Sequence, residues 1–208
     1  TAQAQGFFTH EIIPVSIAQR KGDPIVIDTD EHPRASTTLE GLAKLKPVVT
    51  AEGTVTAGNA SGINDGAAAV LIASEQAIEE YQLKPRAKII ASTAVGIDPR
   101  IMGFAPAPAI KKLLKQANLS IEQMDVIELN EAFAAQALAV TRDLGLADDT
   151  TQVNPNGGAI AIGHPLGASG ARLVTTALNQ LEQTGGTYAL CSMCIGVGQG
   201  IAMIIQRV

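Results

Sequence analysis

The sequence predicts an α/β protein in which a mixed sheet is covered by layers of helices. From Pro85 onward, short apolar runs typical of strands alternate with longer segments whose apolar residues recur at helical spacing. The last two strand-like runs are separated only by the glycine-rich stretch Gly196–Gly200, which favours an antiparallel hairpin at the end of the domain. These features place one layered α/β domain over residues 85–208.

Four strands and three longer helices are expected in this domain. We expect the strands at Lys88–Val95, Val126–Leu129, Tyr188–Ile195 and Ile201–Gln206. We expect the helices at Pro106–Asn118, Glu131–Leu144 and Ala171–Gln183, and a glycine-rich loop at Asn154–Gly170. Ser120 and Gln123 fit a capping box, which predicts a further short helical turn.

Residues 1–84 are more irregular. Extended pieces are expected at Glu11–Ile17 and Pro24–Asp28, short helices at Thr38–Leu45 and Ser74–Leu83, and turns over Thr56–Gly66. The continuously apolar run Ala67–Ala73 is typical of a strand buried on both faces.

The composition excludes several classes of protein. The formal charge of −5 argues against general nucleic-acid binding, which needs a basic surface. No apolar stretch is long enough to span a membrane, and no signal peptide is visible. Two cysteines in 208 residues do not form a disulfide framework, so a reducing, cytoplasmic location is the default expectation. The chain begins Thr-Ala-Gln without Met, which is consistent with processing or truncation.

A histidine lies within the densest group of glycines. Gly157–Gly170 contains five glycines and His164, just before a predicted helix. Glycine allows backbone to approach a ligand closely, and a histidine fixed there by Pro165 suits an acid, a base or an oxyanion donor. A structural turn with a surface histidine is the simpler alternative, but the glycine density favours function.

Both cysteines lie in one predicted strand. Cys191 and Cys194 form a C-x-x-C pattern, yet zinc needs about four ligands and no second pair exists, so no metal site is expected. An offset of three places the two side chains on opposite faces of a strand. Burial as small apolar side chains is the usual role of free cysteines. Cys194, at the end of the strand, is the better functional candidate.

Two polar segments leave structural and functional roles open. Asn130 occupies a predicted strand-to-helix junction, where it would cap the helix or face a ligand at the sheet edge. The polar side chains of Gly58–Gly66 would build turns or bind a polar arm of a ligand.

Four segments together resemble the thiolase family. They are Thr56–Gly66 (TAGNASGINDG), Asn130–Gln136 (NEAFAAQ), Asn154–Gly170 (NPNGGAIAIGHPLGASG) and Cys194–Ala202 (CIGVGQGIA). The resemblance covers essentially the whole chain and corresponds to the second half of a thiolase. It implies that residues 1–84 belong to the end of the N-terminal domain, including part of its loop domain, and that residues 85–208 form a complete C-terminal domain.

The resemblance also implies catalytic roles. His164 would activate a nucleophilic cysteine and, with a water held by Asn130, bind the thioester oxygen. Cys194 would act as the acid and base at the substrate α-carbon, and the N–H of Gly196 would complete a second oxyanion hole. Coenzyme A thioesters would be the substrates, with no permanently bound cofactor.

The resemblance also implies residues that bind the coenzyme A thioester. Ser61 would contact the pantetheine arm and Arg34 the adenine part of coenzyme A, while Met102 and Phe133 would line the acyl pocket. The resemblance also implies a homo-oligomer, dimeric or tetrameric. The charge and hydropathy of the sequence predict no nucleic-acid or membrane partner.

The nucleophilic cysteine of thiolases lies in an N-terminal segment that this sequence does not contain. We therefore expect a fragment of a longer acyltransferase that condenses two acyl-CoA molecules, such as acetyl-CoA to acetoacetyl-CoA, or cleaves the product. The fragment alone is expected to be inactive. A ketoacyl synthase is one alternative, although the cysteine of the CIG motif argues against it. A non-catalytic domain that binds coenzyme A or mediates oligomerisation is the other.

Overall fold

A mixed four-stranded sheet forms the centre of the computed structural model, which describes all of residues 1–208. Its strands are β3 (Ala87–Gly96), β4 (Val126–Leu129), β5 (Tyr188–Ile195) and β6 (Gln199–Arg207), in the order β3-β6-β5-β4. β6 pairs antiparallel with β3 and β5, whereas β4 and β5 are parallel. This confirms the predicted mixed sheet and terminal hairpin.

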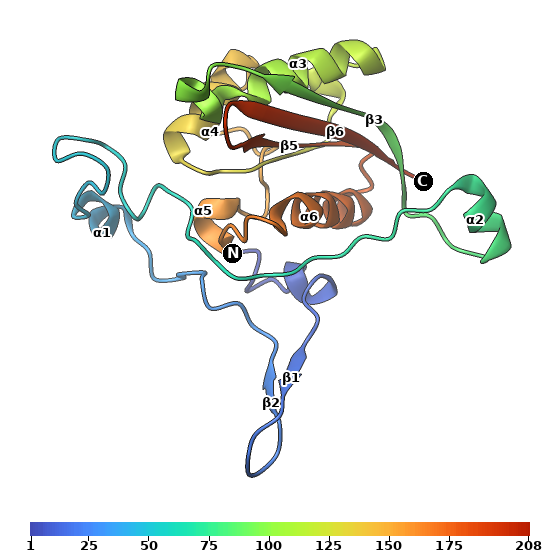
Figure 1. The fold of residues 1–208 in the computed structure, drawn as a ribbon, viewed down its shortest axis with the longest axis horizontal. Coiled ribbons are helices and arrows are strands. Elements are labelled where there is room, and N and C mark those ends of the chain that lie inside the picture. Colours follow the sequence, from blue (N-terminus) through green and yellow to red (C-terminus); the bar gives the residue numbers. More distant parts are fainter.

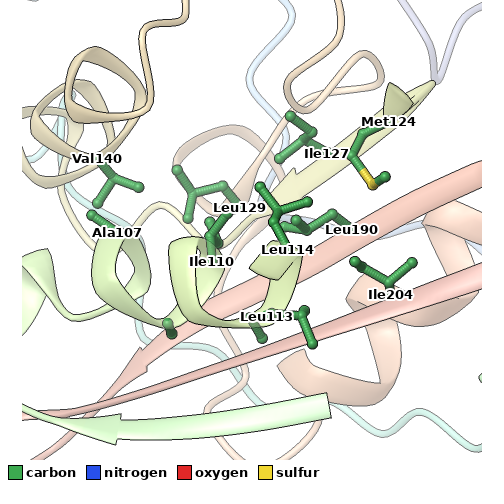
Figure 2. Close-up of a cluster of buried hydrophobic side chains, with 12 residues drawn as sticks. Ala107, Ile110, Leu113, Leu114, Met124, Ile127, Leu129, Val140, Leu190 and Ile204 are labelled. Carbon is green, nitrogen blue, oxygen red and sulfur yellow. The ribbon is translucent and has the colours of Figure 1, made fainter. Parts of the chain in front are cut away.

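Helices cover both faces of the sheet (Figure 1). On one face lie α3 (Pro106–Ala117) and α4 (Ala134–Asp143), and on the other lies α6 (Ser169–Thr184). Figure 2 shows the core beneath α3, where Ile110 and Leu113 meet Leu129, Leu190 and Ile204. A smaller core beneath α6 contains Val126, Leu173, Leu181 and Ile205. Successive side chains of a strand point to opposite faces of the sheet, so the same strands contribute residues to both cores.

Residues 1–84 contain short elements with little core of their own. They are the 3₁₀ helix η1 (Phe7–His10), the antiparallel pair β1 (Val15–Ile17) and β2 (Ile25–Ile27), α1 (Leu39–Ala43) and α2 (Glu75–Glu80). The β1–β2 hairpin projects away from the layered domain (Figure 1). Apart from Phe7, every buried residue lies between Ala105 and Ile205, so the packed core belongs to the second half of the chain.

Most predicted elements are present. β4 and β5 have the predicted bounds, and β3 and β6 each extend slightly beyond them. The capping box also forms, since the Ser120 N–H donates to Gln123 Oε1 at 2.9 Å beside the 3₁₀ helix η3 (Ile121–Gln123). The predicted short helices begin after Thr38 and Ser74, whose side chains accept hydrogen bonds from the first turn.

The predicted buried strand at Ala67–Ala73 is wrong. The segment runs over the surface without a partner strand, and Leu71 and Ile72 are 83% and 71% exposed. A strand buried on both faces needs hydrogen-bonded neighbours and a covering layer on each side, and this chain supplies neither here.

The predicted helix start at Glu131 is also wrong. α4 begins at Ala134 with Phe133 at the N-cap, so Asn130 does not cap it. Three short helices were not expected: η1 (Phe7–His10), the 3₁₀ helix η2 (Pro99–Phe104), and α5 (Ala159–Ile162) within the glycine-rich loop. None of the helices combines the length and apolar character needed to cross a membrane.

Candidate active site

Asn130 and Cys194 lie at the same edge of the sheet. β4 and β5 are parallel and in register, with Leu129 opposite Ser192. Directly after β4, the N–H of Asn130 donates to the carbonyl of Ser192 at 3.0 Å, and Cys194 follows two residues later on β5. Carboxyl ends of parallel strands are the usual place for ligand sites in α/β proteins.

The side chain of Asn130 faces His164 instead of the following helix. Asn130 is fully buried, and its Nδ2 lies 3.3 Å from His164 Nε2. Its Oδ1 accepts no hydrogen bond from the protein although it is buried. A buried amide oxygen without a partner is costly, so this atom suits an interaction with a water or a substrate donor.

Hydrogen bonds fix the tautomer of His164. Its Nδ1 lies 2.6 Å from Ser169 Oγ, and the Ser169 hydroxyl donates to the Pro165 carbonyl at 3.1 Å. A serine hydroxyl has one proton, so Ser169 must accept from Nδ1–H. The lone pair of His164 is therefore on Nε2, where it accepts from the Asn130 amide. This arrangement presents Nε2 as a base.

The backbone of His164 is tied to the segment around Asn64. The His164 N–H donates to Asn64 Oδ1 at 3.1 Å and to the Gly62 carbonyl at 3.2 Å. Asn64 Nδ2 in turn lies 3.3 Å from His32 Nδ1. Gly163 has φ +96°, and a Cβ there would lie 2.6 Å from Asn64 Oδ1. Only glycine permits this close approach.

Burial and charge favour the neutral form of His164. The pKa of His164 is lowered, first by burial and second by the positive charge of Arg172. Both effects penalise the imidazolium. His164 is thus an unprotonated base at neutral pH.

The two cysteines face opposite sides of the sheet, as the offset of three predicts. Cys191 packs in the core beneath α6, and burial followed by the Glu128 carboxylate raises the pKa of its thiol. Cys194 projects from the other face and is 8% exposed. Burial also raises the pKa of the Cys194 thiol, so it carries a proton at neutral pH.

The turn after Cys194 packs closely against η2. Gly196 begins this turn, and Gly198 has φ +86°. The Ile97 N–H donates to the Gly198 carbonyl at 2.7 Å, and a Cβ on Gly198 would lie 2.3 Å from the Ile97 carbonyl oxygen. The turn that begins at Gly196 therefore packs against the start of η2, the 3₁₀ helix that also contains Met102.

This chain matches one family over most of its length. Residues 83–207 match the family described as "Thiolase, C-terminal domain", and residues 1–76 match "Thiolase, N-terminal domain". The chain belongs to the thiolase family. It is 84% identical over 207 residues to a beta-ketoadipyl-CoA thiolase of Acinetobacter baylyi, covering 100% of this chain and 52% of that protein.

Solved thiolase structures superpose on the whole chain. The acetyl-CoA acetyltransferase of Bacillus anthracis gives a TM-score of 0.94 at 44% identity, and it is covered over 52% of its length. Human mitochondrial 3-ketoacyl-CoA thiolase in complex with CoA gives 0.88 at 45% identity, with 51% covered. The chain thus spans about half the length of the relatives it matches.

The four expected binding residues of the thiolase chain differ in their exposure and in their contacts with the rest of the site. The Ser61 N–H donates to the Ala132 carbonyl at 3.0 Å, which fastens Ser61 beside Asn130. Phe133 forms a bridge with the neighbouring Ala60 and is 39% exposed. Met102 is half-buried in η2. Arg34 is exposed, and no hydrogen bond or ion pair joins it to the other candidates.

Sequence reasoning missed three residues that support the site, Ser169, Asn64 and Asn154. Asn154 extends the edge of the sheet, because its side chain accepts from the Leu129 N–H at 2.9 Å and donates to the Leu129 carbonyl at 2.8 Å. It also donates to Glu131 Oε1 at 2.9 Å. The only signal in the sequence was their position inside two of the four thiolase-like segments, Thr56–Gly66 and Asn154–Gly170.

Proposed function

We propose that this chain supplies the proton-transfer and oxyanion-binding groups of a thiolase that acts on coenzyme A thioesters. The observation that carries the proposal is the buried contact between Asn130 and His164, at the sheet edge where β5 carries Cys194 near its end. The attacking cysteine would come from outside residues 1–208. Cys191 is unsuited to that role because it is buried in the core beneath α6 and the pKa of its thiol is raised.

We propose β-ketoadipyl-CoA as the substrate that is cleaved. The 84% identity to a beta-ketoadipyl-CoA thiolase supports this assignment. Acetoacetyl-CoA is the second candidate, supported by the TM-score of 0.94 to an acetyl-CoA acetyltransferase. The two substrates differ at the end remote from the thioester, where the first carries a carboxylate and the second a methyl group.

His164 would act first. Its Nε2 accepts the proton of the attacking thiol, and the thiolate adds to the carbonyl carbon of the substrate. The resulting imidazolium carries a proton on Nε2, which stabilises the negative oxygen that develops. Asn130 Oδ1, which has no partner in the protein, would hold a water that provides a second donor.

Cys194 would then transfer a proton to or from the α-carbon of the substrate. During cleavage the bond between the α-carbon and the attacked keto carbon would break, and the Cys194 thiol would give its proton to the α-carbon of the departing acetyl-CoA. The acyl group would stay on the attacking cysteine until the thiol of a second coenzyme A takes it. During condensation the Cys194 thiolate would remove the α-proton. The N–H of Gly196 would bind the enolate oxygen. Loss of one such donor typically reduces the rate by about 10²–10³.

The same proposal includes substrate binding and assembly. Ser61 and Arg34 would bind the coenzyme A moiety, and Met102 and Phe133 the acyl group. Residues 1–84 and 85–208 would belong to the N- and C-terminal thiolase domains. A homo-oligomer is proposed on the resemblance to thiolases.

The ketoacyl synthase alternative is not favoured, because Cys194 takes the place of a second histidine or asparagine.

Thiolysis by the full-length protein tests the proposal. We expect β-ketoadipyl-CoA to be cleaved in the presence of coenzyme A with a higher kcat/KM than acetoacetyl-CoA. Residues 1–208 alone should cleave neither. Absence of cleavage of both substrates by the full-length protein would refute the thiolase assignment, whereas a preference for acetoacetyl-CoA would refute only the choice of substrate.

A further inference from the structure

A buried ion pair joins β4, which is followed by Asn130, to α6, whose Ser169 holds His164. Glu128 on β4 is fully buried, and the side chain of Arg172 on α6 is 16% exposed. Arg172 Nη1 donates to Glu128 Oε2 at 2.9 Å. The other four ion pairs of the chain lie at the surface, with every side chain at least 35% exposed. The Glu128–Arg172 pair is therefore the one whose desolvation needs an explanation.

The pair lies directly beside the catalytic contact. Glu128 and Asn130 are two residues apart on an extended segment, so their side chains project to the same face, toward α6. Arg172 follows Ser169 by three residues on α6, so the two share one side of the helix. Ser169 holds His164 Nδ1. Glu128 and Arg172 thus connect the strand that carries Asn130 to the helix that orients His164.

Stability alone does not account for this pair. Its surroundings are apolar, since Val126, Leu173 and Cys191 pack in the same layer. Glu128 Oε1 and Arg172 Nη2 are buried without partners. Replacing such a pair by apolar side chains is often neutral or stabilising, because two charges no longer have to leave water.

We propose that Glu128 and Arg172 are positioning residues, which lock β4 against α6 and so set the contact between Asn130 and His164. This inference rests on the proposed thiolase function. Neither residue needs to touch the substrate.

The pair also acts through charge. The groups that titrate or carry charge around this layer are Arg172 on α6, Glu128 on β4, Cys191 and Cys194 on β5, Glu131 after β4, and Glu11 of the N-terminal segment. Among them, the charge of Arg172 reaches His164 and disfavours a second positive charge on the imidazole. Arg172 therefore helps to keep Nε2 ready to accept a proton.

An apolar replacement of both partners separates positioning from folding. In the full-length protein, E128M/R172M should unfold at the same urea concentration as the wild type or higher, while its kcat/KM for thiolysis falls about ten- to hundredfold. R142Q, which breaks the exposed Arg142–Asp148 pair, is the matched control and should change neither quantity. A double variant with wild-type kcat/KM, or one that unfolds at clearly lower urea, would overturn the proposal.

Single variants test the effect of charge. R172Q should move the acidic limb of the pH profile of kcat/KM to higher pH, and R172K should leave it close to the wild type. Titration of the His164 imidazole by NMR tests the same effect without any need for activity: the pKa of His164 should be higher in R172Q than in the wild type and nearly unchanged in R172K. An unchanged titration of His164 in R172Q would contradict the inference. Wild-type protein that cleaves no 3-oxoacyl-CoA would refute the proposed function, and the NMR result would still decide whether Arg172 tunes His164.

Discussion

Ser169 Oγ lies 2.6 Å from Nδ1 of His164 and leaves Nε2 as the unprotonated nitrogen. The hydroxyl achieves this because its only proton is donated to Pro165. Ser169 stands at the first turn of α6 and is 1% exposed, so its hydroxyl cannot be replaced by bulk water. The orientation of the His164 imidazole thus depends on one buried hydroxyl.

Replacing Ser169 by Ala should impair catalysis more than binding. The variant leaves Nδ1–H buried without an acceptor and allows the imidazole to exchange tautomers. We expect kcat of the full-length protein to fall about ten- to hundredfold, with little change in KM. Thr175→Ala, which removes a hydroxyl bound to the Ala171 carbonyl on the same helix, should retain activity. Equal effects of the two variants would argue against a specific role for Ser169.

The two cysteines should respond differently to substitution by Ala. Cys194→Ala should nearly abolish exchange of the acetyl-CoA α-protons with solvent and the condensation reaction, while the attacking cysteine is still acylated. Cys191→Ala should keep most activity, because Cys191 packs as a small apolar side chain on the other face. Isotope exchange and mass spectrometry of the acyl-enzyme measure the two steps separately. Normal proton exchange in Cys194→Ala would contradict the proposed role of Cys194 as the acid and base at the α-carbon.

The parts of the fold that depend on local pattern were predictable from the sequence. β4 and β5 match their predicted bounds because each is an apolar run ended by a polar or glycine-rich stretch. His164 and Asn130 could be singled out because glycine density and a strand end mark places where backbone can approach a ligand.

The parts that depend on tertiary contact were not predictable. The apolar run Ala67–Ala73 indicates that the segment favours burial but not which layer would bury it, and in this chain it lies on the surface. The link between Asn154 and Leu129 joins residues 25 apart, and no local signal pairs them. Asn130 matches the preference for an N-cap, yet the contact with His164 determines its orientation.

Gly198→Ala should destabilise the domain. Gly198 has φ +86°, and a Cβ would lie 2.3 Å from the Ile97 carbonyl oxygen and 3.0 Å from Pro99 N, both backbone atoms that cannot move independently. We expect the free energy of unfolding to fall by about 2–4 kcal/mol. Gly96→Ala, at a position with no atom within 4 Å of the added Cβ and no positive φ, should change it by less than about 1 kcal/mol. Urea unfolding of both variants measures the difference.

Glu128 should make stability depend on pH. Burial raises the pKa of Glu128 to about 7, and the charge and hydrogen bond of Arg172 only partly oppose this rise. In the unfolded chain the carboxyl titrates near its ordinary value of about 4.3. Between these values the folded protein binds a proton that the unfolded chain releases. The contribution of Glu128 to the free energy of unfolding therefore falls as pH rises from about 4.3 to about 7, by up to about 4 kcal/mol, and is constant above.

Comparison with Glu128→Gln isolates this contribution, because glutamine keeps the shape of the side chain and does not titrate. The free energy of unfolding of the wild type minus that of Glu128→Gln should decrease between pH 5 and pH 7 and level off near pH 8. Urea unfolding at several pH values measures it. A difference that increases over this range would mean that Arg172 holds the carboxylate charged and lowers the pKa of Glu128 in the folded protein, because stability then rises with pH.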